Sequence, residues 1–403
     1  MREKTFNKTS LILVLGSLTA LGPFSIDMYL PAFPKMAEGL GTTVPQIAMS
    51  LSSYFIGLAA GQLFYGPFLD RFGRKPPLYM GLFIYILASI ACGFSKSVET
   101  LVVFRFVQAI GGCAAGVTAM AMVRDYFSPQ ESAKVLSLLI LILGLSPLLA
   151  PTIGGLLSTH LGWQSLFWAL TGLGVFVLSL AIFFLPSLYI PNKDHSLHPF
   201  KIVGNYWQIL KNPRFYAYSL AGSIGFSGLF AYLAASPTIF MEIFRVSEQT
   251  YGFIFALLAS GLIGASQINV VLLKRFNNTT ILRAGLIGMF SMATIFFIGT
   301  YFDLLGLPGT LVVLFLYLSC VGFSNPNAAA LALAPFARNA GSAAAMIGFL
   351  QMALGALTSV LIGILKAQQL LPIAGVFVGT SALAVCVLTL GTKRINKDGQ
   401  TPH

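Results

Sequence analysis

The chain has 403 residues, of which 56% are hydrophobic and only 9% charged, whereas a soluble domain has about 25% charged residues. This composition excludes a soluble globular protein and predicts an all-α, multi-pass membrane protein. Its 24 Lys and Arg against 12 Asp and Glu do not point to nucleic acid, because where basic residues lie matters more than their sum.

Twelve apolar segments are long enough to cross a bilayer, which takes about 20 helical residues. They lie near residues 9–31, 47–67, 76–95, 99–122, 134–157, 164–186, 214–235, 250–272, 281–300, 309–332, 341–365 and 371–391. Most basic residues fall on one side of these segments, and only Lys35, Lys96, Arg245 and Lys366 fall in loops on the other. Since basic loops stay in the cytoplasm, we expect both termini to be cytoplasmic.

The first segment contains Asp27, the only one of the 12 acidic residues that falls deep inside an apolar segment. A carboxylate in hydrocarbon costs several kcal/mol, so it normally faces a wet cavity or a cationic partner. In a nearly uncharged helical bundle, such a residue predicts a proton-coupling site.

The loop after the second segment carries Asp70, Arg71 and Arg74 among glycines. Asp70 and Arg74 are four residues apart, so they can form a charged clamp at the cytoplasmic face. The loop resembles the signature loop of the major facilitator superfamily, in which the acid and the arginine lock the outward-facing state. The resemblance gives this role to Asp70, Arg71 and Arg74, with Asp125 as a further partner. A basic cytoplasmic anchor is the alternative, but it does not explain Asp70.

The fourth segment contains Arg105, which is followed by Gln108 and several small residues. This pattern resembles the membrane-embedded arginine motif of the same superfamily, which is associated with proton transfer. Arg105 and Asp27 both lie in the outer half of their segments, so we expect them to form a buried pair and to couple protons together. The alternative is that Arg105 extends to the nearby interface.

The fifth segment combines prolines and glycines, which predict a kinked helix with close helix contacts. These residues are Gly144, Pro147, Pro151, Gly154 and Gly155. The pattern resembles the motif of drug/proton antiporters in the superfamily, although Ala150 replaces the usual glycine before Pro151.

A polar stretch at residues 191–213 separates two halves, 1–190 and 214–403, each with six segments. The halves are related, since a shift of 204 residues aligns Gly57-Leu58 with Gly261-Leu262 and Arg71-Phe72 with Arg275-Phe276. We therefore expect two pseudo-symmetric six-helix bundles joined by a cytoplasmic linker. Duplicated halves place a substrate site at their interface, and one half rocks against the other during transport.

Several motifs together resemble the Bcr/CflA group of bacterial multidrug efflux transporters over essentially the whole chain. They are Asp27-Met28-Tyr29-Leu30-Pro31-Ala32, Tyr65-Gly66-Pro67, Arg124-Asp125-Tyr126 and Ala150-Pro151-Thr152-Ile153-Gly154-Gly155. The resemblance implies a monomeric antiporter of the bacterial inner membrane. It would export drugs of the bicyclomycin, chloramphenicol or sulphonamide type in exchange for protons.

Polar side chains inside the segments are candidates for binding such a drug. They are Tyr29, Tyr54, Gln108, Asn325, Asn327 and Gln351. Each is equally able to bridge two helices. Asn325-Pro326-Asn327 stands out, because a proline frees backbone carbonyls and here two amides flank the expected break.

Two other functions remain open. The first is proton-coupled transport of a physiological solute such as a sugar, amino acid or peptide, because a family does not determine the ligand. The second is a membrane-embedded enzyme or receptor, but the four His residues are scattered and the sequence has no GxxxxGK[ST] phosphate loop. We therefore expect no enzyme activity, no cofactor, no metal ion and no nucleic acid.

Overall fold

The computed structural model describes residues 8–127, 129–186, 199–336, 340–365 and 369–398, and in this part of the chain it is helical. Twelve helices are long and apolar enough to cross a membrane, as predicted. The long helices are α1 (Lys8–Asp27), α3 (Val44–Phe72), α4 (Lys75–Gly93), α5 (Val98–Tyr126), α6 (Pro129–Leu161), α7 (Gln164–Phe184), α9 (Pro213–Pro237), α10 (Glu248–Leu272), α11 (Asn278–Tyr301), α12 (Leu307–Leu333), α13 (Ala340–Ile364) and α14 (Leu370–Asp398). The shorter elements are η1 (Leu30–Ala32), α2 (Phe33–Gly39), α8 (Pro199–Lys211) and the π-helical turn η2 (Thr238–Ile243).

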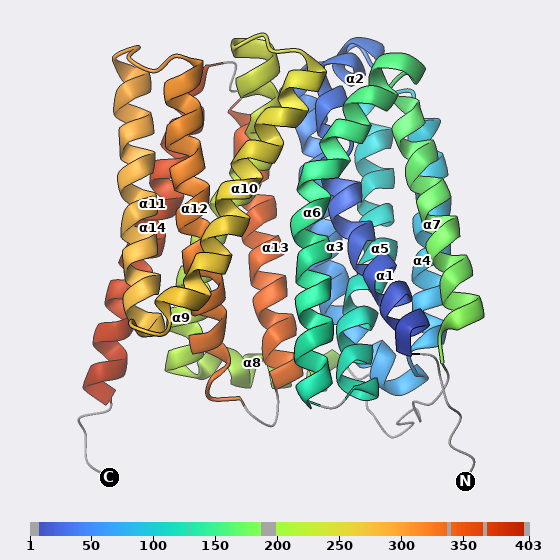
Figure 1. The fold of residues 1–403 in the computed structure, drawn as a ribbon, viewed down its shortest axis with the longest axis vertical. Helices are drawn as coiled ribbons and strands as arrows, with labels where there is room; N and C mark the ends of the chain where they lie inside the picture. The colour runs from blue at the N-terminus through green and yellow to red at the C-terminus, as the bar shows by residue number, and fades with distance from the viewer. Residues whose placement is uncertain (1–7, 128, 187–198, 337–339, 366–368, 399–403) are drawn as a thin grey trace.

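The long helices run side by side along the molecule, and both chain ends lie at the same end of the bundle (Figure 1). We call this the N/C end; it also carries α8. The opposite end, the far end, carries α2. Helices α1–α7 form the N half and α9–α14 the C half. The halves meet along α3 with α13 and α6 with α10, and Ser52 and Ser359 share a 2.6 Å hydrogen bond across the first contact.

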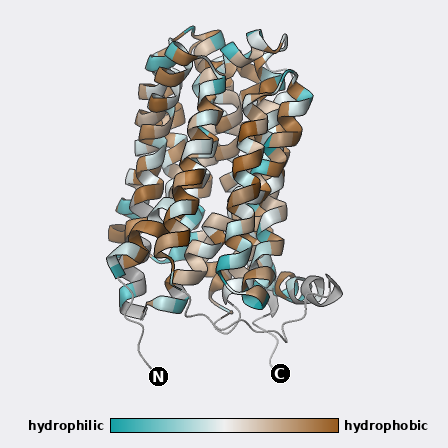
Figure 2. Cartoon of the chain, turned by 90° about the vertical axis from the view of Figure 1, so that its right-hand side faces the viewer, coloured by the Kyte–Doolittle hydropathy of each residue, from teal (hydrophilic) through white to brown (hydrophobic). Residues whose placement is uncertain are grey.

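Helix starts follow polar caps in the sequence. The side chains of Ser97, Ser247 and Asn277 accept hydrogen bonds from backbone N–H groups three residues later, at the starts of α5, α10 and α11. Such caps satisfy donors that the first helical turn leaves unpaired. Hydrophilic residues gather toward the two ends of the bundle and hydrophobic ones along its length (Figure 2), as expected when the middle lies in hydrocarbon.

The prolines do not interrupt the long helices. Helix α6 is continuous through Pro147 and Pro151. Helix α12 is continuous through Pro326, so the break expected between the two asparagines is absent. Pro326 leaves the Gly322 carbonyl without its helical donor, and the Ser266 hydroxyl from α10 donates to that carbonyl at 3.2 Å. A neighbouring helix thus replaces the missing hydrogen bond.

Glycines bring some helices into backbone contact. A Cβ atom on Gly111 of α5 would lie 2.5 Å from the Tyr85 nitrogen and 2.6 Å from the Gly81 oxygen, both in α4. A side chain there does not fit, so glycine sets the spacing between α4 and α5. This close packing places the polar residues of α4 beside those of α5.

Candidate functional site

Arg105 lies at the centre of a polar cluster in the N half and is completely buried. Its guanidinium carbon lies 4.2 Å from the ring centroids of both Tyr29 and Tyr54. Its Nη1 donates to Gln108 Oε1 at 2.6 Å, and its Nη2 donates to the Ser25 carbonyl at 2.9 Å. Two aromatic faces and two hydrogen bonds therefore hold the cation inside the bundle, where a bare charge would be costly.

The cluster extends into α4. Gln108 Nε2 donates to Ser89 Oγ at 2.7 Å, and the Ser25 and Tyr85 hydroxyls are 2.7 Å apart. Two buried polar atoms in this cluster, the Tyr54 hydroxyl and Arg105 Nε, have no hydrogen-bond partner among the described residues. Buried polar groups normally find a partner, so these two atoms keep an unused hydrogen-bonding capacity in this arrangement of the helices.

The expected ion pair between Asp27 and Arg105 is not formed. No such pair occurs between described residues. The reason is helix rotation, because successive residues in an α-helix are turned by about 100°. Ser25 of α1 and Tyr29, which follows the end of α1, both contact Arg105, while Asp27 is turned about 200° from Ser25 around the helix. The sequence predicts similar depths for the two charges, but it does not predict the directions in which their side chains point.

Asp27 is 5% exposed and turns toward the C half instead. Just after it in the chain, η1 contacts α9 and α10 of the C half, the helices that carry Tyr232 and Tyr251. The Tyr251 hydroxyl also shares a 2.8 Å hydrogen bond with Ser236, whereas the buried Tyr232 hydroxyl has no partner among the described residues. The carboxyl group therefore sits at the junction of the two halves.

The polar candidates of the C half form two separate amide pairs. Asn327 Nδ2 donates to Asn269 Oδ1 at 2.7 Å, which joins α12 to α10. Gln351 Nε2 donates to Asn325 Oδ1 at 2.7 Å, which joins α13 to α12. The six drug-binding candidates thus fall into three groups: Tyr29, Tyr54 and Gln108 around Arg105, and two amide pairs elsewhere. No described contact joins the three groups.

At the N/C end, Arg74 connects two carboxylates. Its Nη1 lies 2.9 Å from Asp70 Oδ1, and its Nε lies 2.6 Å from Asp125 Oδ2. Only 4% of the Arg74 side chain is exposed, so these charge-assisted bonds are shielded from solvent. Arg71 instead lies over the Phe72 ring, 5.8 Å from its centroid. Nearby, burial and then the Asp70 carboxylate raise the pKa of Tyr206 in α8, which places α8 beside this loop.

The glycines of α6 face different neighbours. Gly154 touches the carbonyl group of Met28, the residue after Asp27, so closely that no Cβ fits. A Cβ on Gly155 would lie 3.2 Å from the backbone carbonyl oxygen of Glu248, and a Cβ on Gly144 would lie 3.5 Å from the side chain of Ile263. Gly154 thus packs α6 against the end of α1 in the N half, while Gly144 and Gly155 pack it against α10 of the C half.

Sequence reasoning missed several polar residues of these groups. Ser25, Tyr85 and Ser89 belong to the Arg105 cluster, and Tyr232 and Tyr251 lie near Asp27. The spacing of Ser25 and Tyr29, like that of Tyr85 and Ser89, is one helical turn, a signal that would have placed each pair on one face. The approach of the two tyrosines to Asp27 has no comparable signal in a single sequence.

Comparison with known proteins decides the family. The model of the Major Facilitator Superfamily matches residues 15–391. The chain belongs to this superfamily. It is 32% identical to a bicyclomycin resistance protein homolog of Haemophilus influenzae over 382 residues, which cover 94% of this chain and 96% of the relative. It is 30% identical to the multidrug resistance protein MdtL of Klebsiella pneumoniae, with 95% and 96% covered.

A third bacterial relative and a solved structure agree with this assignment. The chain is 32% identical to the uncharacterized MFS-type transporter YdgK of Bacillus subtilis, with 89% of each chain covered. Its fold matches the crystal structure of a D-xylose-proton symporter with a TM-score of 0.72, covering 94% of this chain and 97% of that one. At 13% identity that match shows the fold alone. The relatives confirm the superfamily and the efflux group predicted from the motifs.

Proposed function

We propose that the chain exports small drug molecules across a bacterial inner membrane in exchange for protons, with Asp27 as the residue that carries the proton. The observation that carries the proposal is the position of Asp27. It is the one buried acidic side chain among the described residues, and it lies where the halves meet. The basic residues place the N/C end in the cytoplasm, so Asp27 lies toward the outer side of the bundle.

The drug specificity follows from the relatives. The names of the Haemophilus and Klebsiella proteins point to bicyclomycin and to several drugs, respectively. Their match over nearly the whole chain supports drug substrates, bicyclomycin among them, and the resemblance of the motifs adds chloramphenicol and sulphonamides to the proposed set. The sugar symporter shares the fold but only 13% of its sequence, so it does not favour a sugar.

In the proposed cycle, Asp27 carries the proton and the cluster around Arg105 binds the drug. Arg105 orients Tyr29, Tyr54 and Gln108, and the Tyr54 hydroxyl, which has no partner among the described residues, is the group left for a drug to bind. Asp27 takes up a proton in one orientation of the halves and releases it in the other, because its surroundings change as the C half moves. Drug and proton bind alternately, so the inward movement of protons drives the drug out.

The test uses purified protein in proteoliposomes with a pH gradient. Asp27→Asn should abolish gradient-driven drug accumulation, because an amide cannot exchange the proton. It should retain drug/drug exchange and drug binding to within about threefold, since the Arg105 cluster is intact. Glu99→Gln is the matched control, because it neutralises an exposed acid in the first turn of α5. Accumulation by Asp27→Asn at the wild-type level would refute the role of Asp27.

The drug class is tested separately. Cells expressing the chain and cells with an empty vector are compared for susceptibility to bicyclomycin, chloramphenicol and a sulphonamide. Higher resistance to at least one of them is expected, and the expressed Asp27→Asn variant should not confer it. Equal susceptibility to all three, with the protein present in the membrane, would contradict the assigned substrates.

A further inference from the structure

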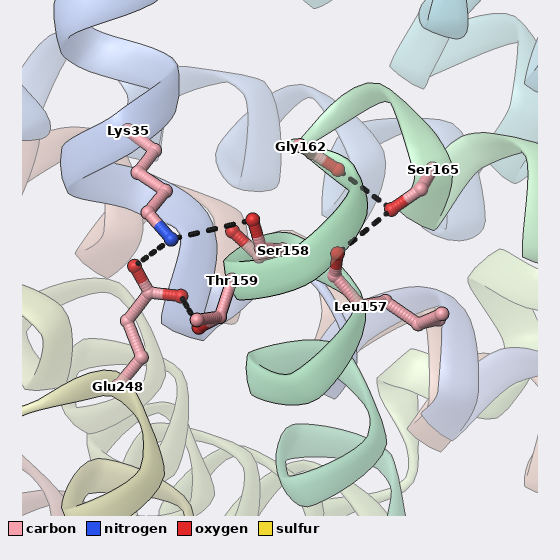
Figure 3. Close-up of polar contacts among 7 residues, drawn as sticks. All are labelled: Lys35, Leu157, Ser158, Thr159, Gly162, Ser165 and Glu248. Carbon is pink, nitrogen blue, oxygen red and sulfur yellow. Dashed lines mark hydrogen bonds and ion pairs between the residues drawn. The ribbon is translucent and has the colours of Figure 1, made fainter.

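The far end of the bundle contains an ion pair between the two halves (Figure 3). Lys35 Nζ of α2 lies 2.9 Å from Glu248 Oε1 at the start of α10. The same ammonium group donates to the Ser158 carbonyl of α6 at 3.3 Å. The Thr159 hydroxyl of α6 donates to the other carboxylate oxygen of Glu248 at 3.2 Å. Lys35 and Thr159 of the N half thus hold the same carboxylate of the C half.

Local structure positions each partner. Glu248 is in the first turn of α10, where backbone N–H groups favour negative charge, and Ser247 caps that turn. Lys35 approaches the last turn of α6, whose carbonyls lack helical donors and favour positive charge. The Glu248 side chain is only 16% exposed, which strengthens the attraction relative to a pair in open water. Both charges therefore lie where the helices already favour them.

This contact differs from the other ion pairs in the described part of the chain. Lys8–Glu131, Asp70–Arg74 and Arg74–Asp125 each join residues within the N half. Lys35–Glu248 is the one described pair that joins the halves. The backbone is also close here, since a Cβ on Gly252 of α10 would lie 3.3 Å from the Thr152 Cα of α6. When the far ends of the halves separate, these contacts have to break.

We propose that Lys35, Thr159 and Glu248 form a clasp that holds the far end closed and thereby favours the state open toward the N/C end. The proposal rests on transport by alternating access, as proposed above. The clasp is connected to the proton site through the chain: Lys35 follows Asp27 by eight residues, across η1. Gly154 of α6 also touches Met28, next to Asp27. Opening the clasp moves the segment that carries Asp27, so it links gate opening to the proton.

The test measures the distance between the halves directly. Spin labels are attached at Lys96 and Leu304, exposed positions in a far-end loop of each half, after the four native cysteines are replaced. Lys35→Gln and Glu248→Gln should each increase the ratio of long to short distances roughly two- to fivefold, which corresponds to an ion pair of about 0.4–1 kcal/mol. The double variant should resemble either single variant, because each removes the same interaction.

Glu99→Gln is again the matched control. Like Glu248, Glu99 lies in the first turn of a helix at the far end, but no described contact joins it to the C half. It should leave the distance distribution unchanged. Equal distributions in wild type and Glu248→Gln would overturn the clasp, and so would an equal shift in Glu99→Gln. The distances are measured without drug or pH gradient, so this failure is distinguishable from a failure of the proposed function.

Discussion

Replacing Gly154 with alanine places a methyl group where the carbonyl group of Met28 now lies. The obstacle is backbone, with the Met28 Cα only 3.2 Å from the new atom, so a change of side-chain rotamer cannot relieve it. Helix α6 and the end of α1 have to separate, and Asp27 has to move with Met28. Overpacking of this kind costs about 1–3 kcal/mol.

Gly144→Ala is the matched comparison in the same helix. There the nearest atoms belong to the flexible Ile263 side chain, at 3.5 Å or more, which is ordinary contact. Both variants gain about the same helix-forming tendency from alanine, roughly 0.5–1 kcal/mol. The difference between them therefore isolates the clash with Met28, and about 1–3 kcal/mol of destabilisation remains for Gly154→Ala.

The assay combines thermal unfolding in detergent with the transport measurement. Gly154→Ala should unfold about 1–4 °C below Gly144→Ala, and its drug/proton exchange should show a shifted pH profile because Asp27 is displaced. Gly144→Ala should keep the wild-type profile. Equal unfolding temperatures and equal pH profiles for the two variants would refute the argument that Gly154 sets the position of Asp27.

Two further predictions concern the charged residues of the N half. Arg105→Lys should lower drug affinity about tenfold or more, with Asp27-dependent coupling retained, because an ammonium group cannot contact both tyrosine rings and bond to Gln108 and Ser25 together; unchanged affinity in equilibrium binding would contradict this. Asp70→Asn should slow turnover several-fold without changing drug affinity, because Arg74 loses one of its carboxylates; weaker binding at unchanged turnover would contradict it.

Features that depend only on spacing along the chain can be predicted from the sequence. Twelve spans follow from apolar length alone, because a helix in hydrocarbon satisfies its own backbone groups. The approach of Asp70 to Arg74 is predicted from their separation of four residues, and the turn at Gly73 between α3 and α4 brings the two side chains to 2.9 Å. Neither inference requires knowing how one helix is rotated against another.

Contacts that depend on how a helix is rotated about its axis, or on segments far apart in the chain, cannot be predicted from spacing alone. The segment ends predict similar depths for Asp27 and Arg105. Whether the two side chains meet also depends on the direction in which each one points from its helix. Pro326 was expected to break α12, but the Ser266 hydroxyl on another helix keeps the helix whole. The ion pair between Lys35 and Glu248 joins α2 of the N half to the start of α10 in the C half, and no motif in a single sequence connects them.

Because Asp27 is not paired with Arg105, the proposed proton site and the buried cation have different surroundings. Arg105 donates its hydrogen bonds to Gln108 and Ser25, both in the N half, so these residues would move as a unit in the proposed rocking of the halves. The neighbours of Asp27 include Tyr232 and Tyr251 of the C half, and their positions change relative to the carboxyl group in the same motion. In the proposed cycle, the dependence of proton binding on the conformational state therefore belongs to Asp27. An acid paired with Arg105 inside one half would keep the same partner throughout the cycle, and protons would not be coupled to the opening of either end.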